Sequence, residues 1–401
     1  MATPRALIVG MGIAGLATAM RLREVGWEPV IVERAPERRS AGYFVGLFET
    51  GRATAQRMGV LDAIGNRTDR DGMTYDVDRS GTKRRPGMGY ADLPGDPRLI
   101  LRGDIESALY DQAAGTTEIR YGTSPAAIEE HADGIDVTLR TTDGHESTER
   151  FDLVVGADGL RSTVRRLVFG PDEELMRPLN HIIGVALLEE QVPGFGPSDG
   201  LILAEEGRSV WVFGFADHTP TVMFSYRTVD ESAQFQGAPI DRLRDAFGPE
   251  QAGPILENLF DQFEAAEDSL FDSVHQVVMP TWHTDRVVLV GDAAWCLTLY
   301  SGMGASTGIA GADLLGTTLA RNPGNTARAL REWEQRLRPF IEVQQRSGRT
   351  DGLAMFVPQT RRDLLMRNTM SLIGGNKVTR GAFRSMIAGK FKEKSLDVAA
   401  P

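Results

Sequence analysis

A glycine triplet near the N-terminus, Gly10, Gly12 and Gly15, constrains the fold of this chain more than any other feature. It follows the apolar run Ala6–Val9 and opens a helical pattern, and a second apolar run, Pro29–Val32, comes after that helix. The first glycine permits a tight turn, the second lets the backbone approach a pyrophosphate, and the third lets the helix pack on the strand. The pattern therefore predicts a parallel strand–helix–strand unit that binds a dinucleotide.

The ends of this unit supply the groups that a dinucleotide needs. Unpaired N–H groups and a partial positive charge at the helix N-terminus suit phosphates, so we expect Ile13 and Ala14 to contact the cofactor. Glu33 comes 18 residues after Gly15, followed by Arg34, at the end of the second strand, where a carboxylate accepts hydrogen bonds from ribose hydroxyls. The triplet alone does not separate FAD from NAD.

Further along the chain, the dinucleotide-binding pattern is interrupted and then resumed. Hairpin signals between Glu118 and Phe151 predict a small antiparallel meander. Alternating runs between residues 180 and 229 predict a second antiparallel sheet, followed by a helical stretch, Ile240 to Phe263, and a returning strand, Arg286–Val290. The expected α/β fold combines three units: a Rossmann-type dinucleotide-binding domain of residues 1–75, 98–178 and 279–325, an inserted antiparallel-sheet substrate domain of residues 76–97 and 179–278, and a helical C-terminal segment of residues 326–401.

Composition limits the partners of the protein. A formal net charge of −11 argues against a nucleic-acid surface, which needs clustered Lys and Arg. Cys296 is the only cysteine, and no signal-peptide pattern or long apolar run is present, so we expect a cytoplasmic protein without membrane insertion, as a monomer or homodimer. A basic amphipathic pattern in Arg361–Lys394 indicates a membrane-surface helix or, preferably, a helix packed on the domain with a solvated face.

Three further segments, taken with the glycine triplet, resemble the group A flavoprotein monooxygenases, the FAD-dependent aromatic hydroxylases. They are Leu101–Ile105, Gly156–Arg165 and Val290–Ala294. The resemblance implies that Arg102 reaches the FAD diphosphate and ribityl region, that Asp158 lies between flavin and nicotinamide cofactor, and that Asp292 holds the ribityl chain. Each residue alone also fits a plainer role, as a surface charge, a turn or a helix cap.

The same resemblance assigns a role to the helix after Asp292. In the family its N-terminus, here Gly302, Gly304 and Ala305, points at the flavin N1–C2 edge and stabilises the negative charge of reduced flavin. The sequence departs from the family pattern in this loop, where Trp295 replaces a frequent His, Leu299 a frequent Pro and Ser306 the usual Asn. Because of these departures, the family pattern does not predict the shape of the substrate side of the site.

The resemblance also implies the reaction. NADPH or NADH binds transiently and reduces FAD, O₂ adds to form a flavin C4a-hydroperoxide, and an aromatic or polycyclic small molecule is hydroxylated or epoxidised. The flavin carries this chemistry, so no catalytic side chain is assigned beyond the loop of Leu299, Gly302, Gly304 and Ala305. The six histidines show no metal-ligand spacing. A flavin dehydrogenase, a halogenase-like oxidoreductase and a non-catalytic FAD-binding protein remain alternatives.

A predicted hairpin supplies the candidate substrate residues. If Ala216 pairs with Thr221, alternation places six mostly aromatic side chains on one face of the sheet. The predicted substrate contacts, with Leu299 added from the flavin loop, are Trp211, Phe213, Phe215, Phe224 and Tyr226. The alternative is that these aromatic residues only form the core of that domain.

Overall fold

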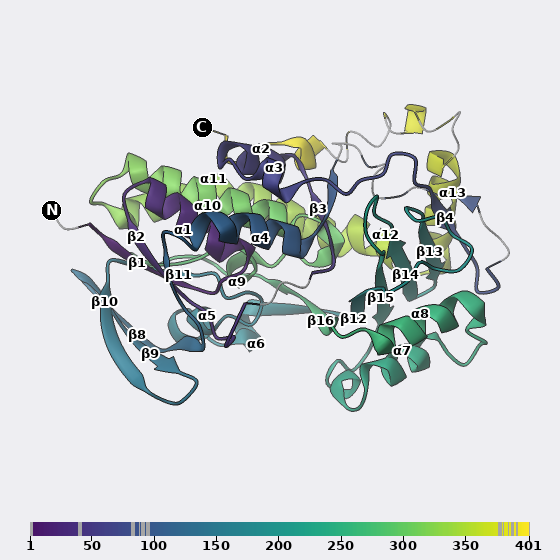
Figure 1. Ribbon diagram of the computed structural model, residues 1–401, viewed down its shortest axis with the longest axis horizontal. Coiled ribbons are helices and arrows are strands. Elements are labelled where there is room, and N and C mark those ends of the chain that lie inside the picture. Colours follow the sequence, from purple (N-terminus) through teal and green to yellow (C-terminus); the bar gives the residue numbers. More distant parts are fainter. Residues whose placement is uncertain are drawn as a thin grey trace.

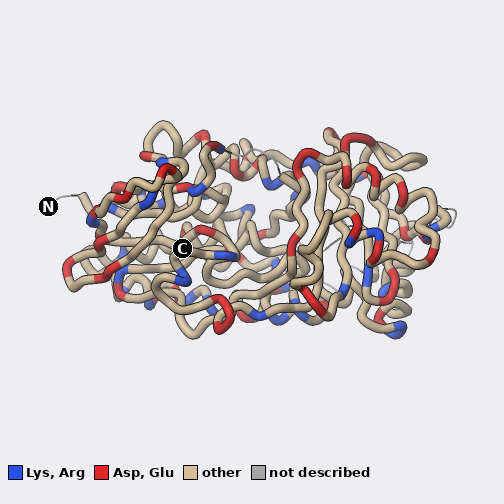
Figure 2. The backbone as a smooth tube through the Cα atoms, turned by 90° about the horizontal axis from the view of Figure 1, so that it is seen from below, with Lys and Arg blue, Asp and Glu red and all other residues tan. Residues whose placement is uncertain are grey.

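A parallel sheet and a larger antiparallel sheet lie side by side along the long axis of the molecule (Figure 1). The computed structural model describes residues 3–38, 42–81, 85–87, 89, 93, 97–375, 379, 381–383, 385, 389 and 392–400. Figure 2 shows Lys and Arg interspersed with Asp and Glu over the whole length of this described chain. No helix in the described ranges is long and apolar enough to cross a bilayer.

The parallel sheet confirms the predicted strand–helix–strand unit. Its order is β17-β11-β1-β2-β7, and every neighbouring pair is parallel. The strands are β1 (Arg5–Val9), β2 (Glu28–Val32), β7 (Glu118–Arg120), β11 (Leu153–Gly156) and β17 (Val287–Leu289). Figure 1 shows helices α1 (Ile13–Glu24), α4 (Arg102–Ala113) and α10 (Gly304–Arg321) along one face. Residues 6–9 and 29–32 are fully buried, as expected for central parallel strands.

The predicted meander is present as a separate three-stranded antiparallel sheet. It consists of β8 (Thr123–His131), β9 (Gly134–Thr141) and β10 (Glu146–Phe151). Its first expected residues instead join the parallel sheet as β7, where Ile119 pairs with Ile31 of β2. The meander packs on the other side of β11, so it supports the parallel sheet without approaching the antiparallel one (Figure 1).

The larger sheet has seven strands in the order β16-β12-β15-β14-β13-β4-β5. They are β4 (Thr74–Asp76), β5 (Arg85–Pro86), β12 (Met176–Leu187), β13 (Gly200–Glu205), β14 (Arg208–Phe213), β15 (Thr221–Arg227) and β16 (Ser269–Val277). Among the described strands of this sheet, only β13 and β4 pair in parallel. Helices α7 (Pro239–Phe247) and α8 (Gly253–Ala265) cover one face. The predicted single helix is interrupted because Gly248 and Pro249 end α7.

The predicted register of the β14–β15 hairpin is wrong by three residues. Phe213 pairs with Thr221 and not with Phe224, and Trp211 pairs with Met223 and not with Tyr226. An odd shift exchanges faces, so Phe224 and Tyr226 lie on the side opposite Phe213. The cause is a longer loop: residues 214–220 leave the sheet, because the Ala216 amide donates to the carbonyl of Arg67 and Gly214 lies against Ser198.

Phe224 belongs to the core beneath α7 and α8. Its ring contacts Phe247, Phe260 and Phe263 at centroid distances of 5.9, 5.4 and 5.7 Å. Tyr226 lies on the same side of the sheet, and its hydroxyl donates to Gln234 at 2.8 Å. Neither residue is a substrate contact in this register, and for these two side chains the core alternative holds.

The remaining elements connect and cover the two sheets. They are β3 (Phe44–Leu47), α2 (Glu49–Arg57), α3 (Leu61–Ile64), β6 (Arg98–Leu101), α5 (Thr163–Val168), α6 (Asp172–Leu175), η2 (Ser232–Phe235), α9 (Asp292–Trp295), η3 (Leu299–Ser301), α11 (Thr326–Ser347), the π-helical η4 (Gly348–Gly352), α12 (Leu353–Phe356), α13 (Arg361–Gly375) and η5 (Lys392–Ser395). The tail is thus helical as expected. Helix α13 packs on the antiparallel sheet through a buried ion pair between Arg367 and Asp76 (3.1 Å).

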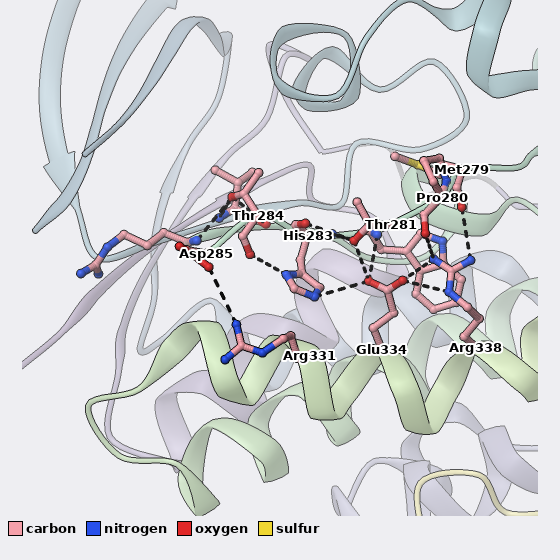
Figure 3. Close-up of polar contacts among 12 residues, drawn as sticks. Met279, Pro280, Thr281, His283, Thr284, Asp285, Arg331, Glu334 and Arg338 are labelled. Atoms are coloured by element: carbon pink, nitrogen blue, oxygen red, sulfur yellow. Dashed lines mark hydrogen bonds and ion pairs between the residues drawn. The ribbon is translucent and has the colours of Figure 1, made fainter. Parts of the chain in front are cut away.

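A buried carboxylate fixes α11 to the segment before β17 (Figure 3). Glu334 accepts hydrogen bonds from the Thr281 hydroxyl and the Trp282 amide, both at 3.0 Å, and pairs with Arg338 on its own helix. Arg338 also donates to the carbonyls of Met279 and Pro280. These bonds satisfy a charge that would otherwise be costly to bury, and they seat α11 against the parallel sheet.

Candidate active site

A cavity of about 420 Å³ lies between the N-termini of α1 and α10 and one face of the antiparallel sheet. Ten of the predicted site residues line it: Gly12, Ile13, Ala14, Arg102, Phe213, Asp292, Leu299, Gly302, Gly304 and Ala305. The segments that carry them are far apart in sequence, so the fold brings together what the motifs had indicated separately.

The glycine triplet shapes the first wall of the cavity. Gly10 has φ +102°, and a Cβ there would lie 2.5 Å from the carbonyl oxygen of Ala157, so only glycine fits. A Cβ on Gly15 would lie 2.0 Å from the Gly10 carbonyl oxygen. At Gly12, by contrast, the nearest atom to such a Cβ is 3.7 Å away, because this glycine faces the cavity. The space beside Gly12 fits a phosphate group.

Glu33 holds the glycine loop in place. Its two carboxylate oxygens accept hydrogen bonds from the backbone amides of Met11 (2.9 Å) and Ala35 (2.8 Å). Glu33 therefore lies directly behind the turn, while the next residue, Arg34, is exposed. Neither side chain is part of the cavity lining.

Two charged residues of the predicted site, Arg102 and Asp292, line the cavity. Arg102 forms an ion pair with Glu106 (2.6 Å) on the same helix, and burial raises the pKa of Glu106 while Arg102 opposes that rise. Asp292 is exposed toward the cavity, yet the surrounding protein raises the pKa of its carboxyl by desolvation, again opposed by Arg102. A carboxylate in this position is an acceptor for hydroxyl groups.

The N-terminus of α10 forms the floor beside Asp292. The helix begins at Gly304 without a side-chain cap, so its first amides are available to an acceptor in the cavity. The Cβ position of Gly304 lies 4.0 Å from Oδ1 of Asp292. Gly302, just before the helix, has φ +67° and completes the turn. With the uncapped α1 N-terminus, two helix dipoles converge on this cavity.

Asp158 has a structural task. Its carboxylate accepts hydrogen bonds from the Ser162 hydroxyl (2.6 Å) and from the Thr163 (2.6 Å) and Val164 (3.2 Å) amides, which caps α5. Burial raises the pKa of Asp158, and these hydrogen bonds oppose the rise. The cavity is lined by its neighbours Ala157, Gly159 and Leu160. Asp158 itself is therefore a helix cap, a role that differs from the plain turn expected as its alternative.

Arg165, at the end of the same motif, is a positioning residue that motif reading did not single out. Its side chain is fully buried and donates to the carbonyls of Ala293 (3.0 Å) and Leu160 (2.6 Å). It also pairs with Asp172. Arg165 thereby connects the segment around Asp158 to the segment around Asp292. Its place in the Gly156–Arg165 motif was the sequence signal that could have identified it.

The wall opposite α10 is apolar. Phe213 stacks on Phe44 with ring centroids 4.0 Å apart and planes 2° from parallel. Trp211 lies beside Phe213 but outside the lining, with its indole N–H donating to the carbonyl of Phe356. Phe215 is fully buried behind Phe44. The lining residues that the pattern did not predict include Tyr43, Phe44, Ile183, Val185, Thr221, Met223, His275, Cys296 and Phe356.

Two of the three residues that depart from the family pattern, Trp295 and Ser306, are buried in the core, and Leu299 lines the cavity. Trp295 packs with Trp282 and Trp333 at centroid distances of 4.8 and 5.8 Å, in a cluster next to α9. Ser306 accepts a hydrogen bond from the Phe48 amide at 3.0 Å and so fixes the first turn of α10 to the start of α2. No group of three or more His, Cys, Asp or Glu in the described ranges could hold a metal ion.

Comparison with known proteins identifies the family. The model of the FAD binding domain family matches residues 3–333. A flavin-dependent monooxygenase of Legionella longbeachae serogroup 1 (strain NSW150) is 30% identical over 354 residues, which cover 85% of this chain and 87% of the relative. The chain belongs to the FAD-binding monooxygenase family that the glycine triplet and the Asp292 motif indicate. It is a flavin-dependent monooxygenase, and FAD is its cofactor.

Solved structures share the fold. The tetracycline destructase Tet(55) superposes with a TM-score of 0.78 at 23% identity, covering 100% of this chain and 99% of that one. HpxO of Klebsiella pneumoniae, in complex with FAD and uric acid, superposes with a TM-score of 0.72 at 20% identity, covering 98% of this chain and 96% of that one. These likenesses confirm the predicted combination of a Rossmann-type unit, an antiparallel sheet and C-terminal helices.

Proposed function

We propose that the protein hydroxylates or epoxidises a flat, weakly charged aromatic or polycyclic small molecule, with NADPH or NADH as the electron donor. The observation that supports this substrate class is the pair of parallel rings, Phe213 and Phe44, in the cavity wall opposite α10. Met223, Ile183 and Val185 extend the wall. Flat apolar surfaces of this kind stack on aromatic rings.

The charges in the lining support the same class. Arg102 is paired with Glu106, Asp272 with Arg161 (2.7 Å) and His275 with Glu231 (3.3 Å). Among the described lining residues, the arginine and the histidine therefore each already have a carboxylate partner. A small aromatic acid needs a cation for its carboxylate, so this arrangement favours a substrate with little net charge.

We further propose how the chain holds FAD. Gly12, Ile13 and Ala14 take the diphosphate at the α1 N-terminus, Arg102 lies beside it, and Glu33 supports the turn or accepts from the ribose. Asp292 accepts hydrogen bonds from the ribityl hydroxyls. The parallel-sheet part, residues 1–75, 98–178 and 279–325, then holds the cofactor, and residues 76–97 and 179–278 the substrate.

FAD, once bound, supplies electron transfer from the nicotinamide and activation of O₂. The protein's contribution is orientation and exclusion of water. The uncapped amides of Gly304 and Ala305 stabilise negative charge at the cavity floor. Leu299 and the Phe213–Phe44 pair keep the reacting space apolar and hold the substrate ring against it.

A screen of aromatic and polycyclic compounds tests this function. We expect a subset to accelerate NAD(P)H oxidation by the FAD-loaded protein, with O₂ consumed and one atom of ¹⁸O₂ recovered in the product. Reduced flavin that is inert to O₂ and passes electrons only to another acceptor would establish the dehydrogenase alternative. Turnover only with small aromatic acids would leave the monooxygenase activity standing and contradict the substrate class.

A further inference from the structure

The loop that leads into α10, residues 297–302, is strained and held from several sides. Thr298 has φ +72° and ψ +155°, a conformation that a β-branched residue rarely adopts, and its Oγ1 is buried without a hydrogen-bond partner among the described residues. The Leu297 carbonyl accepts from Nε2 of Gln276 (3.2 Å). The Tyr300 hydroxyl is hydrogen-bonded to Ser225 (2.6 Å). Such a loop keeps its shape only while these anchors hold.

Another anchor comes from the far end of the chain. Nζ of Lys394, on η5, donates to the carbonyl oxygen of Ser301 at 2.5 Å. The same ammonium lies 5.0 Å from the centroid of the Phe48 ring, and the Phe48 amide bonds to Ser306 in the first turn of α10. Lys394 therefore touches both segments that frame the N-terminus of α10.

The tail that carries Lys394 is docked at further points. Asp397 pairs with Arg57 of α2 at 2.5 Å, and the Val398 amide donates to the Thr50 hydroxyl at 3.2 Å. These contacts hold the residues after η5 against α2. They therefore fix the position from which Lys394 reaches Ser301.

We propose that Lys394 is a positioning residue for the flavin: through the Ser301 carbonyl it fixes the turn at Gly302 and so aims the first amides of α10 into the cavity. It does not line the cavity and contacts no reacting atom. The inference rests on the proposed placement of FAD beside α10. A charge-assisted hydrogen bond is the kind of contact that holds a strained turn.

The charge of Lys394 gives the proposal a pH signature. Burial lowers the pKa of Lys394 to about 8, so the ammonium is lost as the pH rises through that value. The charged groups of α2 that face the tail are paired, Glu49 with Arg52 and Arg57 with Asp313 and Asp397. On η5 itself, Lys392 and Glu393 are exposed. Flavin binding should therefore weaken between about pH 7 and 9.

Stability changes in the opposite direction over the same range. The unfolded chain keeps the lysine proton up to its ordinary pKa of about 10.4, whereas the folded protein releases it near pH 8. The unfolded state then binds more protons, so this group makes the free energy of unfolding rise with pH above about 8. Weaker FAD binding with unchanged or greater stability separates positioning from a general loss of fold.

The experiment compares Lys394→Met and Lys394→Arg with the matched control Lys392→Met on the same short helix. The readouts are the FAD dissociation constant between pH 6.5 and 9.5, the reduction potential of the bound flavin, and amide hydrogen exchange of the peptide spanning residues 297–306 in the FAD-free protein. None of them requires a substrate or NAD(P)H, so their failure is distinct from failure of the proposed function.

In Lys394→Met we expect the FAD dissociation constant to rise about tenfold at pH 7, the size of one lost hydrogen bond to a charged group. The reduction potential should fall, because the α10 amides stabilise reduced flavin less well, and exchange of the 297–306 peptide should speed up. Lys394→Arg should bind FAD like the parent at pH 7, and its FAD affinity should no longer change with pH near pH 8. Parental values for Lys394→Met in all three measurements, or an equal effect of Lys392→Met, overturn the proposal.

Discussion

The hydroxyl oxygens of Tyr300 and Ser225 lie 2.6 Å apart, and this buried hydrogen bond joins the loop before α10 to strand β15 of the antiparallel sheet. Both side chains are inaccessible to water. The loop that leads into α10 and the antiparallel sheet, which both contribute to the cavity lining, are thus connected by this contact.

Tyr300→Phe should test the connection. Removing the hydroxyl leaves Ser225 only its bond to the Ile182 carbonyl (3.3 Å) and should lower the free energy of unfolding by about 1 kcal/mol. We also expect weaker coupling, meaning that less product forms for each NAD(P)H oxidised. Chemical denaturation of Tyr300→Phe, Ser225→Ala and the double variant measures the coupling. Fully additive effects of the two changes would show that the hydroxyls do not act on each other.

Gly12→Val should abolish FAD binding while the chain still folds. The Cβ position of Gly12 faces the cavity with 3.7 Å to its nearest neighbour, so the added side chain occupies phosphate space without clashing with the backbone. The ratio of flavin absorbance to protein concentration measures FAD binding, and the melting temperature of the FAD-free protein shows whether the chain still folds. Gly10→Val is the contrasting variant, because its side chain would overlap the Ala157 carbonyl and should prevent folding. Stoichiometric FAD in Gly12→Val would refute the assigned diphosphate site.

Asp292→Ala should weaken FAD binding by about 1.5–3 kcal/mol, the range for hydrogen bonds to a charged group. Desolvation by the surrounding protein raises the pKa of Asp292, so in the parent protein FAD affinity should also fall as the pH drops toward that raised value and the carboxylate takes up a proton. Equilibrium dialysis at several pH values measures both effects. Asp285→Ala, which removes an exposed carboxylate near Arg331, is the charge-matched control. An unchanged dissociation constant in Asp292→Ala would contradict its role.

Phe213→Ala and Phe224→Ala form a pair that distinguishes the cavity wall from the core. Phe224 is fully buried among three phenylalanines, and its truncation should cost about 3–5 kcal/mol of stability. Phe213 lines the cavity, so its truncation should chiefly raise the KM for substrate or reduce coupling. Thermal melts and steady-state kinetics on both variants give the comparison. A large drop in melting temperature for Phe213→Ala with unchanged kinetics would assign that ring to the core.

Local sequence patterns were sufficient for much of the parallel-sheet half. Gly10, Gly12 and Gly15 follow the spacing of a single strand–helix turn, and Asp292 comes three residues after β17, so short-range patterns were enough to single them out. The resemblance of the later motifs then brought Arg102 and Gly304 to the same cavity.

Long-range contacts explain what the sequence did not reveal. The hairpin register depended on how residues 214–220 bond to Arg67 and Ser198, which lie far away in the chain. Phe356 reaches the cavity only because α12 packs across the antiparallel sheet. Asp158 was placed near the cofactor by its motif, but local geometry directs its carboxylate to the α5 amides. Tertiary packing decided the first two, and a local helix cap decided the third.

The tryptophan cluster beside α9 should make the intrinsic fluorescence of the protein sensitive to bound FAD. Three of the five tryptophans, Trp282, Trp295 and Trp333, lie together, and Trp295 is only three residues from Asp292. Tryptophan emission overlaps the near-ultraviolet absorption of oxidised flavin, so FAD bound at this cavity should quench the cluster by energy transfer. Intrinsic fluorescence can therefore follow loading and release of the flavin in real time, without a label.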